Sequence, residues 1–106
     1  MVIERFGVYL AALDPGVGAE MRKTRPCLVI SPQEMHRTVR TVIIAPLTST
    51  QKGFPFRVDC AFQGHKGEVA LDQMRALDRS RFGRHLGQID SATAAQVILT
   101  LKNMFA

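Results

Sequence analysis

The hydrophobic pattern of this sequence changes its period once, near Asp90. Beyond that residue the apolar positions recur at spacings of three and four, as on one face of an α-helix, and they are Ala94, Val97, Ile98, Leu101, Met104 and Phe105. The Asp90 carboxylate can accept hydrogen bonds from the N–H groups at the start of such a helix. Before Asp90 the apolar residues fall in short runs between turn residues, which is typical of strands. We therefore expect several short antiparallel strands followed by one C-terminal helix.

Proline, glycine and polar residues delimit the expected strands. Strands are predicted at 6–13, 26–31, 39–47 and 54–60, a single helical turn at 33–37, and one bent strand or two strands over 68–78. The segment 54–60 follows a polar turn at 48–53, so we expect it to form a hairpin with 39–47. Asp14-Pro15-Gly16 and Gly64 to Gly67 predict turns, and 79–87 is basic and irregular. This order favours a small β-barrel or strongly curved sheet with the helix packed against it.

Length and charge limit the class of protein. A chain of 106 residues suffices for one compact domain, expected over 1–106. We see no signal segment and no apolar run approaching the ~20 residues that cross a bilayer, so we expect a cytoplasmic protein with no membrane partner. The excess of 14 Lys and Arg over 9 Asp and Glu gives a net charge of +5 and favours a polyanionic or acidic partner. The positive residues fall in two groups that only the fold can join: Arg22, Lys23 and Arg25, and Arg75, Arg79, Arg81 and Arg84.

Cysteine and histidine give no metal signature. Cys27 and Cys60 each lie in an apolar segment and are expected to be buried, reduced thiols. The chain lacks a CxxC motif and paired histidines, so neither a zinc site nor another metal cofactor is expected. His36, His65 and His85 each lie in a polar, turn-like context and are expected to be exposed to solvent rather than catalytic.

The outer face of the predicted helix is uncharged. Ala95, Gln96, Leu99 and Thr100 lie on it, and Lys102 is the only ionised residue after Asp90. A helix face that meets water usually carries several charges. We therefore expect this face to be buried in a homodimer, with an uncharged polar surface as the alternative.

Two segments carry candidate chemistry. Arg25 opens the stretch "RPCLVIS", so a strand restrains the base of a side chain whose planar fork suits phosphate. The alternative is a solvated loop cluster of charges. Thr48-Ser49-Thr50 follows the apolar segment 39–47, where hydroxyls either bond the local backbone or donate to a phosphate oxygen. These residue types indicate an anion-binding site.

The sequence resembles the MazF/PemK family of toxin endoribonucleases from bacterial toxin–antitoxin pairs. The resemblance covers nearly the whole chain, in the family's order and spacing. It is carried by "LDPGVGAE" (13–20), "RPCLVIS" (25–31), "VIIAPLTST" (42–50), "KGFPFRV" (52–58), "VALDQMRALD" (69–78) and the amphipathic tail. It implies a small SH3-like antiparallel β-barrel with a C-terminal helix, a homodimer, and metal-independent, sequence-specific cleavage of single-stranded RNA, with messenger RNA as the expected target. It also implies a cognate antitoxin whose acidic, disordered segment covers the RNA-binding groove.

The resemblance also implies roles for individual residues. Arg25 matches the arginine that opens the family's "RP" strand, and Thr48 matches the first hydroxyl residue after its "AP" strand; both are credited with catalysis in the family. Cleavage through a 2′,3′-cyclic phosphate uses the RNA's own 2′-OH, so the protein aligns the phosphate and stabilises its charge. The candidates for RNA contact in the surrounding loops are Glu20, Lys52, Phe54, Gln73 and Arg75. Phe54 is either a stacking surface for a base or a core aromatic.

The sequence departs from the family pattern in two places. Phe6-Gly7 stands where members commonly carry Gly-Asp, which concerns local structure. Met21 stands where an amide often follows the loop glutamate, so the cleavage sequence cannot be carried over from the family. Two other functions fit the same features: a non-catalytic SH3-like module that binds RNA or an acidic peptide, and a gyrase-poisoning toxin of the same superfamily.

Overall fold

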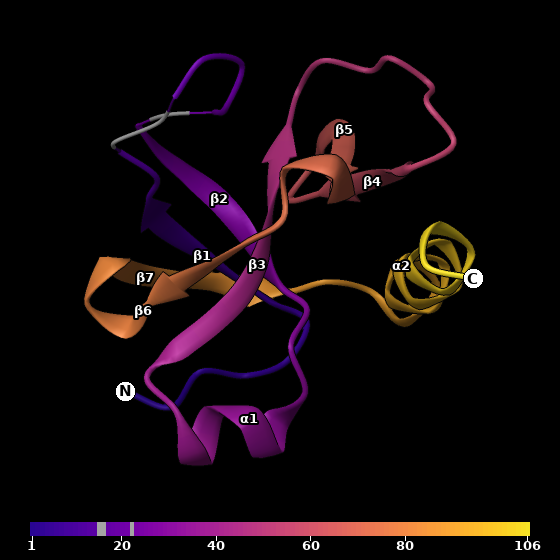
Figure 1. The fold of residues 1–106 in the computed structure, drawn as a ribbon. Helices are drawn as coiled ribbons and strands as arrows, with labels where there is room; N and C mark the ends of the chain where they lie inside the picture. Colours follow the sequence, from indigo (N-terminus) through magenta and orange to yellow (C-terminus); the bar gives the residue numbers. More distant parts are fainter. Residues whose placement is uncertain (15–16, 22) are drawn as a thin grey trace.

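The computed structural model describes residues 1–14, 17–21 and 23–106, so the predicted turn at Pro15-Gly16 and the side chain of Arg22 lie outside the described residues. The strands are β1 (Gly7–Ala12), β2 (Thr24–Val29), β3 (Thr41–Thr48), β4 (Arg57–Phe62), β5 (His65–Ala70), β6 (Arg75–Asp78) and β7 (Phe82–Gln88). The helices are α1 (Gln33–Thr38) and α2 (Ser91–Met104), with short 3₁₀ turns at Leu71–Gln73 and Arg79–Arg81. The predicted mainly β fold with a C-terminal helix is confirmed (Figure 1).

The strands form one curved antiparallel sheet in the order β4-β5-β3-β2-β1-β7, and β6 pairs with β3. Apolar residues are buried on both faces of the central strands. Tyr9 and Cys27 belong to one buried cluster, whereas their neighbours Val8 and Leu28 belong to another that includes Val97 of α2. In Figure 1 helix α2 lies beside β4, apart from the crossing of β1, β2 and β3. The two clusters pack on opposite faces of these strands. The start of β2 and the end of β3 lie beyond the buried residues.

The predicted hairpin between 39–47 and 54–60 is wrong, because β5 lies between β3 and β4. Strand β4 pairs with β5 from Arg57 opposite Ala70 to Phe62 opposite His65. The turn that joins them is Gln63-Gly64, where φ is +51° and +80°, and a two-residue turn with positive φ at both positions matches the twist of a hairpin. This local pairing leaves residues 49–56 as a long connection from β3 to the far side of β5.

The segment predicted to be irregular at 79–87 contains strand β7. It pairs with β1, but the register shifts between Val8 and Tyr9 and again between Tyr9 and Ala11. Such bulges break the alternation of apolar and polar residues by which a strand is recognised in a sequence. Of the two alternatives for 68–78, the structure has two strands, β5 and β6.

Helix α2 begins as predicted, since the Asp90 carboxylate accepts hydrogen bonds from the Thr93 N–H and hydroxyl at 3.0 and 2.6 Å. Leu99 is 51% exposed on the outer face. Thr100 does not belong to that face, because it is buried and its hydroxyl donates to the Gln96 carbonyl at 2.8 Å. Within the described residues, no helix combines the length and the apolar character that crossing a membrane requires.

Candidate active site

The register of β2 and β3 brings Arg25 and Thr48 together. The β2–β3 pairing ends with Cys27 opposite Pro46. Arg25 lies two residues before Cys27 and Thr48 two residues after Pro46, so each lies on the same face of its strand as this last pair. Both residues line one pocket of about 330 Å³. Arg25 is half-buried near the start of β2, and Thr48 is the last residue of β3. The two central strands therefore hold the predicted catalytic pair where β2 begins and β3 ends.

The rest of this pocket, which we call the Arg25–Thr48 pocket, was missed by sequence reasoning. Its other lining residues come largely from the β4–β5 hairpin, and they are Pro26, Leu47, Ser49, Cys60, Phe62, Gln63, His65, Lys66, Gly67 and Leu86. The prediction paired segment 54–60 with 39–47, so it did not place the β4–β5 hairpin beside Arg25. The one signal in the sequence was the basic segment Gly64-His65-Lys66-Gly67, which was predicted as a turn, whereas His65 to Gly67 belong to β5. Lys66 and Arg25 give the pocket two positive charges, which suits a phosphate.

The Thr48 backbone and hydroxyl are both fixed. A Cβ atom on Gly67 would lie 2.1 Å from the Thr48 carbonyl oxygen, so β5 approaches the end of β3 as closely as glycine allows. The Thr48 Oγ1 accepts a hydrogen bond from the Thr50 N–H at 3.2 Å. This local bond is the simpler of the two roles predicted for the hydroxyl. It leaves the hydroxyl proton available to donate to a ligand.

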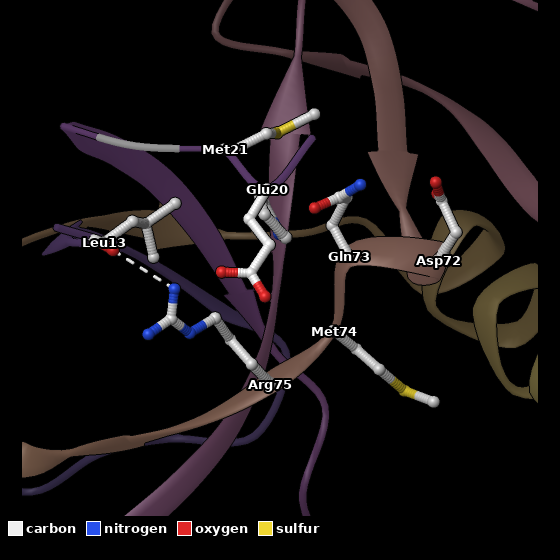
Figure 2. Close-up of a pocket in the computed structure, with 8 residues that line it drawn as sticks. Leu13, Glu20, Met21, Asp72, Gln73, Met74 and Arg75 are labelled. Carbon is white, nitrogen blue, oxygen red and sulfur yellow. Dashed lines mark hydrogen bonds between the residues drawn. The ribbon is translucent and has the colours of Figure 1, made fainter. Parts of the chain in front are cut away.

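Three of the five predicted RNA-contact residues line a second pocket of about 230 Å³. Figure 2 shows Glu20, Gln73 and Arg75 gathered around it. The Arg75 Nη1 donates to the Leu13 carbonyl at 3.1 Å, and the Glu20 Oε1 accepts from the Val17 N–H at 2.9 Å. Both side chains are thus anchored to the described parts of the connection between β1 and β2. We call this space the Glu20–Arg75 pocket.

Lys52 and Phe54 lie in neither of these pockets but on the connection 49–56. Phe54 is 41% exposed, and its ring centroid lies 5.1 Å from that of Phe56. The Lys52 Nζ and the Arg57 Cζ each lie 5.9 Å from the Phe54 ring centroid. Phe54 is therefore not a core aromatic, and its exposed ring keeps the predicted role of a surface on which a base stacks.

Comparison with known proteins identifies the family. The model of the PemK-like, MazF-like toxins of type II toxin–antitoxin systems matches residues 4–105. The chain belongs to this family of toxins. Members named as endoribonucleases include PemK of Escherichia coli, 30% identical over 102 residues that cover 91% of this chain and 77% of PemK. EndoA of Bacillus subtilis, also named an endoribonuclease, is 32% identical over 96 residues, which cover 85% of this chain and 83% of EndoA.

The fold of this PemK/MazF-family toxin is that of solved MazF structures. MazF from Deinococcus radiodurans superposes with a TM-score of 0.87 at 30% identity and covers 99% of this chain and 97% of its own. The structure of the MazE–MazF complex from the same organism gives a TM-score of 0.80 at 29% identity, covering 100% and 97%. The mainly antiparallel sheet with its C-terminal helix is thus the MazF-like fold.

The histidines of this PemK/MazF-family toxin differ in their surroundings. His36, predicted to be exposed, is buried: its Nε2 lies 2.7 Å from the Ser31 Oγ and its Nδ1 lies 3.0 Å from the Ile3 carbonyl oxygen. A carbonyl only accepts, so Nδ1 carries the proton and the Ser31 hydroxyl donates to Nε2. His65 and His85 are exposed, as predicted. His36 therefore holds the N-terminal segment against α1, and His65 is the histidine of the Arg25–Thr48 pocket.

The two cysteines are free thiols. Cys27 is buried as predicted, and burial raises the pKa of its thiol to about 12. Cys60 is only half-buried, on the wall of the Arg25–Thr48 pocket, and burial raises the pKa of this thiol as well. In the described part of the chain, no three or more His, Cys, Asp or Glu side chains are grouped so that they could hold a metal ion.

Acid should destabilise this toxin through three hydrogen-bonded carboxylates. The pKa of Glu68 is lowered chiefly by the Gly53 N–H, that of Asp78 by the Ser80 N–H and Arg40, and that of Asp90 by the Thr93 hydroxyl and N–H. Each stabilising contribution is complete above the unfolded-state pKa of about 4 and is lost as pH falls through the lower folded-state pKa. We expect the urea concentration at the midpoint of unfolding to decrease as the pH is lowered below about 4. The variant Glu68→Gln/Asp78→Asn/Asp90→Asn should lose less stability between pH 7 and 3 than the wild type, and an equal loss would contradict this account.

Proposed function

We propose that this chain is a sequence-specific endoribonuclease toxin that cleaves single-stranded RNA, including messenger RNA, at the Arg25–Thr48 pocket. The observation that carries the proposal is that one pocket contains both residues, in a member of a family whose relatives PemK and EndoA are named endoribonucleases. The match of the family model to residues 4–105 supports our treatment of residues 1–106 as one toxin domain.

The proposed reaction uses the RNA's own nucleophile. The 2′-OH attacks the adjacent phosphorus, the bond from phosphorus to the 5′-oxygen breaks, and a 2′,3′-cyclic phosphate forms. The departing 5′-oxygen takes up a proton from solvent and becomes a 5′-hydroxyl. Arg25 stabilises the charge on the non-bridging oxygens, and the Thr48 hydroxyl donates a hydrogen bond that aligns the phosphate. His65, on the wall of the same pocket, is the imidazole available to accept the 2′-OH proton. Arg25 supplies the positive charge, so the reaction as proposed needs no metal ion.

Base recognition is assigned to the Glu20–Arg75 pocket and the 49–56 connection. Single-stranded RNA is recognised by bonding the edges of splayed bases and by stacking their faces. Glu20 and Gln73 offer an acceptor and an amide for base edges, and Arg75 adds a donor beside them. Lys52 is proposed to contact the backbone and Phe54 to stack on a base.

Two protein partners belong to the same proposal. The MazE–MazF complex from Deinococcus radiodurans supports a cognate antitoxin for this chain, and the net charge of +5 suits an acidic antitoxin segment. The second partner is another copy of this chain. The exposed Leu99 and its uncharged neighbours Ala95 and Gln96 on α2 are the surface that we propose it covers.

The test of the proposed function is incubation of the purified protein with a long single-stranded RNA in EDTA, followed by sequencing of the new 5′ ends. We expect cuts at one short recurring sequence, with 5′-hydroxyl ends and cyclic phosphates on the other fragments. Intact RNA, whatever the sequence supplied, would favour the non-catalytic binding module. Inhibition of DNA supercoiling together with intact RNA would favour the gyrase poison.

Thr48→Ala should lower kcat by about 10–100-fold, less than the loss from Arg25→Ala. The variant removes one hydrogen bond to a charged phosphate, whereas the positive charge remains. Thr48→Ser keeps the hydroxyl and should retain most of the activity, so it is the matched control. The check is kcat on an oligonucleotide that carries the mapped site. A greater loss from Thr48→Ala than from Arg25→Ala would mean that the two roles are reversed.

A further inference from the structure

Glu68 is a buried acid that the proposed reaction does not use. It lies on β5 directly opposite Thr48 of β3, and it is 1% exposed. A carboxylate at this depth is costly unless charges and hydrogen bonds compensate it. Its partners therefore show what the acid does.

The Glu68 carboxylate holds the 49–56 connection by its backbone. Its Oε2 accepts hydrogen bonds from the Lys52 N–H at 3.1 Å and the Gly53 N–H at 2.8 Å. Gly53 has φ +70°, a conformation that favours glycine, and consecutive N–H groups in such a turn form a concave site for an anion. In this toxin the anion is the protein's own carboxylate.

Arg57 links Glu68 to the Glu20–Arg75 pocket. The other carboxylate oxygen, Oε1, has no hydrogen-bond partner among the described residues, and it faces the Arg57 Nη1 at 3.6 Å. The Arg57 guanidinium is 6% exposed and donates to Asp72, from Nε to Oδ1 at 2.6 Å and from Nη2 to Oδ2 at 3.1 Å. Asp72 lines the Glu20–Arg75 pocket. A chain of charges thus runs from the strand beside Thr48 to the second pocket, buried at Glu68 and Arg57 and exposed at Asp72.

We propose that Glu68 is a positioning residue that fixes the 49–56 connection in the shape that presents Lys52 and Phe54 to RNA. Its carboxylate binds the backbone of Lys52 and Gly53, and Phe54 follows directly. Arg25 and Thr48 are held by strand pairing, with Ala11 of β1 and with Glu68 of β5, and this backbone pairing does not use the Glu68 carboxylate. The loss of Glu68 should therefore weaken RNA binding far more than it slows the chemical step. This inference rests on the proposed RNA cleavage.

Three variants grade the interaction. Glu68→Gln keeps the shape and one acceptor for the two N–H groups but loses the charge that faces Arg57. Glu68→Ala leaves both N–H groups and Arg57 without the carboxylate. Gly53→Ala strains the same turn by its φ alone, because no atom of the described residues lies within 4 Å of the added methyl. Asp78→Ala is the matched control, since Asp78 also binds a backbone N–H and an arginine, Ser80 and Arg40, but outside both pockets.

The experiment measures amide hydrogen exchange and cleavage kinetics on one set of proteins, well below their unfolding temperatures. In Glu68→Ala we expect the Lys52 and Gly53 amides to exchange at least about tenfold faster, while the Leu28 and Ala45 amides of the β2–β3 ladder are unchanged. KM for the mapped oligonucleotide should rise about tenfold with kcat within about threefold, and Glu68→Gln should be intermediate. Gly53→Ala should raise KM, and Asp78→Ala should change neither constant.

Several results would overturn the proposal. Unchanged exchange at Lys52 and Gly53 in Glu68→Ala would show that the carboxylate does not hold the turn. Faster exchange with an unchanged KM would show that the turn does not serve RNA, and a fall in kcat alone would place Glu68 at the reacting phosphate. If the wild type neither binds nor cuts any RNA, the proposed function itself fails. If the wild type is active and Glu68→Ala is unaffected, only the role proposed for Glu68 fails.

Discussion

Arg25→Ala should abolish detectable RNA cleavage, a loss of at least about 10³-fold, and leave the protein folded. The guanidinium supplies the positive charge that the proposed reaction places on the phosphate, and a single preorganised donor to developing charge is already worth about 10²–10³-fold. Arg25 lies near the start of β2 at the pocket edge, while the buried residues of that strand begin at Cys27. The fold should therefore persist, which a thermal unfolding scan and the exchange of β2 amides would check.

The controls for Arg25 separate charge from geometry. Arg25→Lys keeps the charge but loses the planar fork that binds two phosphate oxygens, so its activity should be intermediate. Arg84→Ala removes an exposed arginine of β7 that lies outside the residues described as lining either pocket, and it should cleave at the wild-type rate. Wild-type cleavage by Arg25→Ala would refute the assigned role. An equal loss in Arg84→Ala would indicate that net charge, and not this position, carries the effect.

Gly67→Ala should damage both the fold and the activity. The added Cβ would lie 2.1 Å from the Thr48 carbonyl oxygen and 3.0 Å from its carbonyl carbon, and backbone atoms cannot rotate away as a side chain can. The strands β3 and β5 must separate, at a cost that we expect to be about 1–3 kcal/mol, as for other overpacked sites. Since Thr48 and Glu68 face each other across this contact, the separation also displaces the hydroxyl that we propose to be catalytic and the carboxylate that binds the 49–56 connection.

Gly83→Ala is the matched control for Gly67→Ala. Gly83 also lies in a strand, but a Cβ there would meet the Leu10 carbonyl oxygen at an ordinary 3.5 Å. In Gly67→Ala we expect a lower urea midpoint, and also a lower activity under conditions in which the variant is still folded. We expect neither change in Gly83→Ala. Wild-type stability and activity in Gly67→Ala would show that the β3–β5 contact is looser than described.

The elements that sequence alone predicts correctly are those with local causes. Asp90 and the apolar spacing after it define α2, and the apolar run after Arg25 defines β2. Arg25 and Thr48 were predicted as the catalytic pair because the family resemblance named them, and the paired strands β2 and β3 bring both to one pocket. Strand β7 was missed because bulges interrupt its pairing with β1.

The components of the site that sequence reasoning missed depend on distant pairing. Periodicity shows that 54–60 is extended, but it does not state which strand pairs with it, and the tight turn at Gln63-Gly64 decided the pairing in favour of β5. His65 and Lys66 therefore line the Arg25–Thr48 pocket, whereas the sequence predicted them to lie in a separate turn. Glu68 carries no pattern in the sequence, because its partners are backbone N–H groups, which every residue except proline offers.

The position of Leu86 on the wall of the Arg25–Thr48 pocket bears on how this toxin folds during its synthesis. The pocket joins Pro26, near the start of the chain, to Leu86 of β7. Strand β7 pairs with β1, and the Gln63 Nε2 donates to the Leu86 carbonyl at 2.7 Å. Contacts between residues so far apart in sequence form slowly, because the entropy of closing a long loop opposes them. A nascent chain that does not yet include β7 would carry Arg25 and Thr48 without a complete pocket, so the topology delays the assembly of the proposed active site until most of the polypeptide has been synthesised.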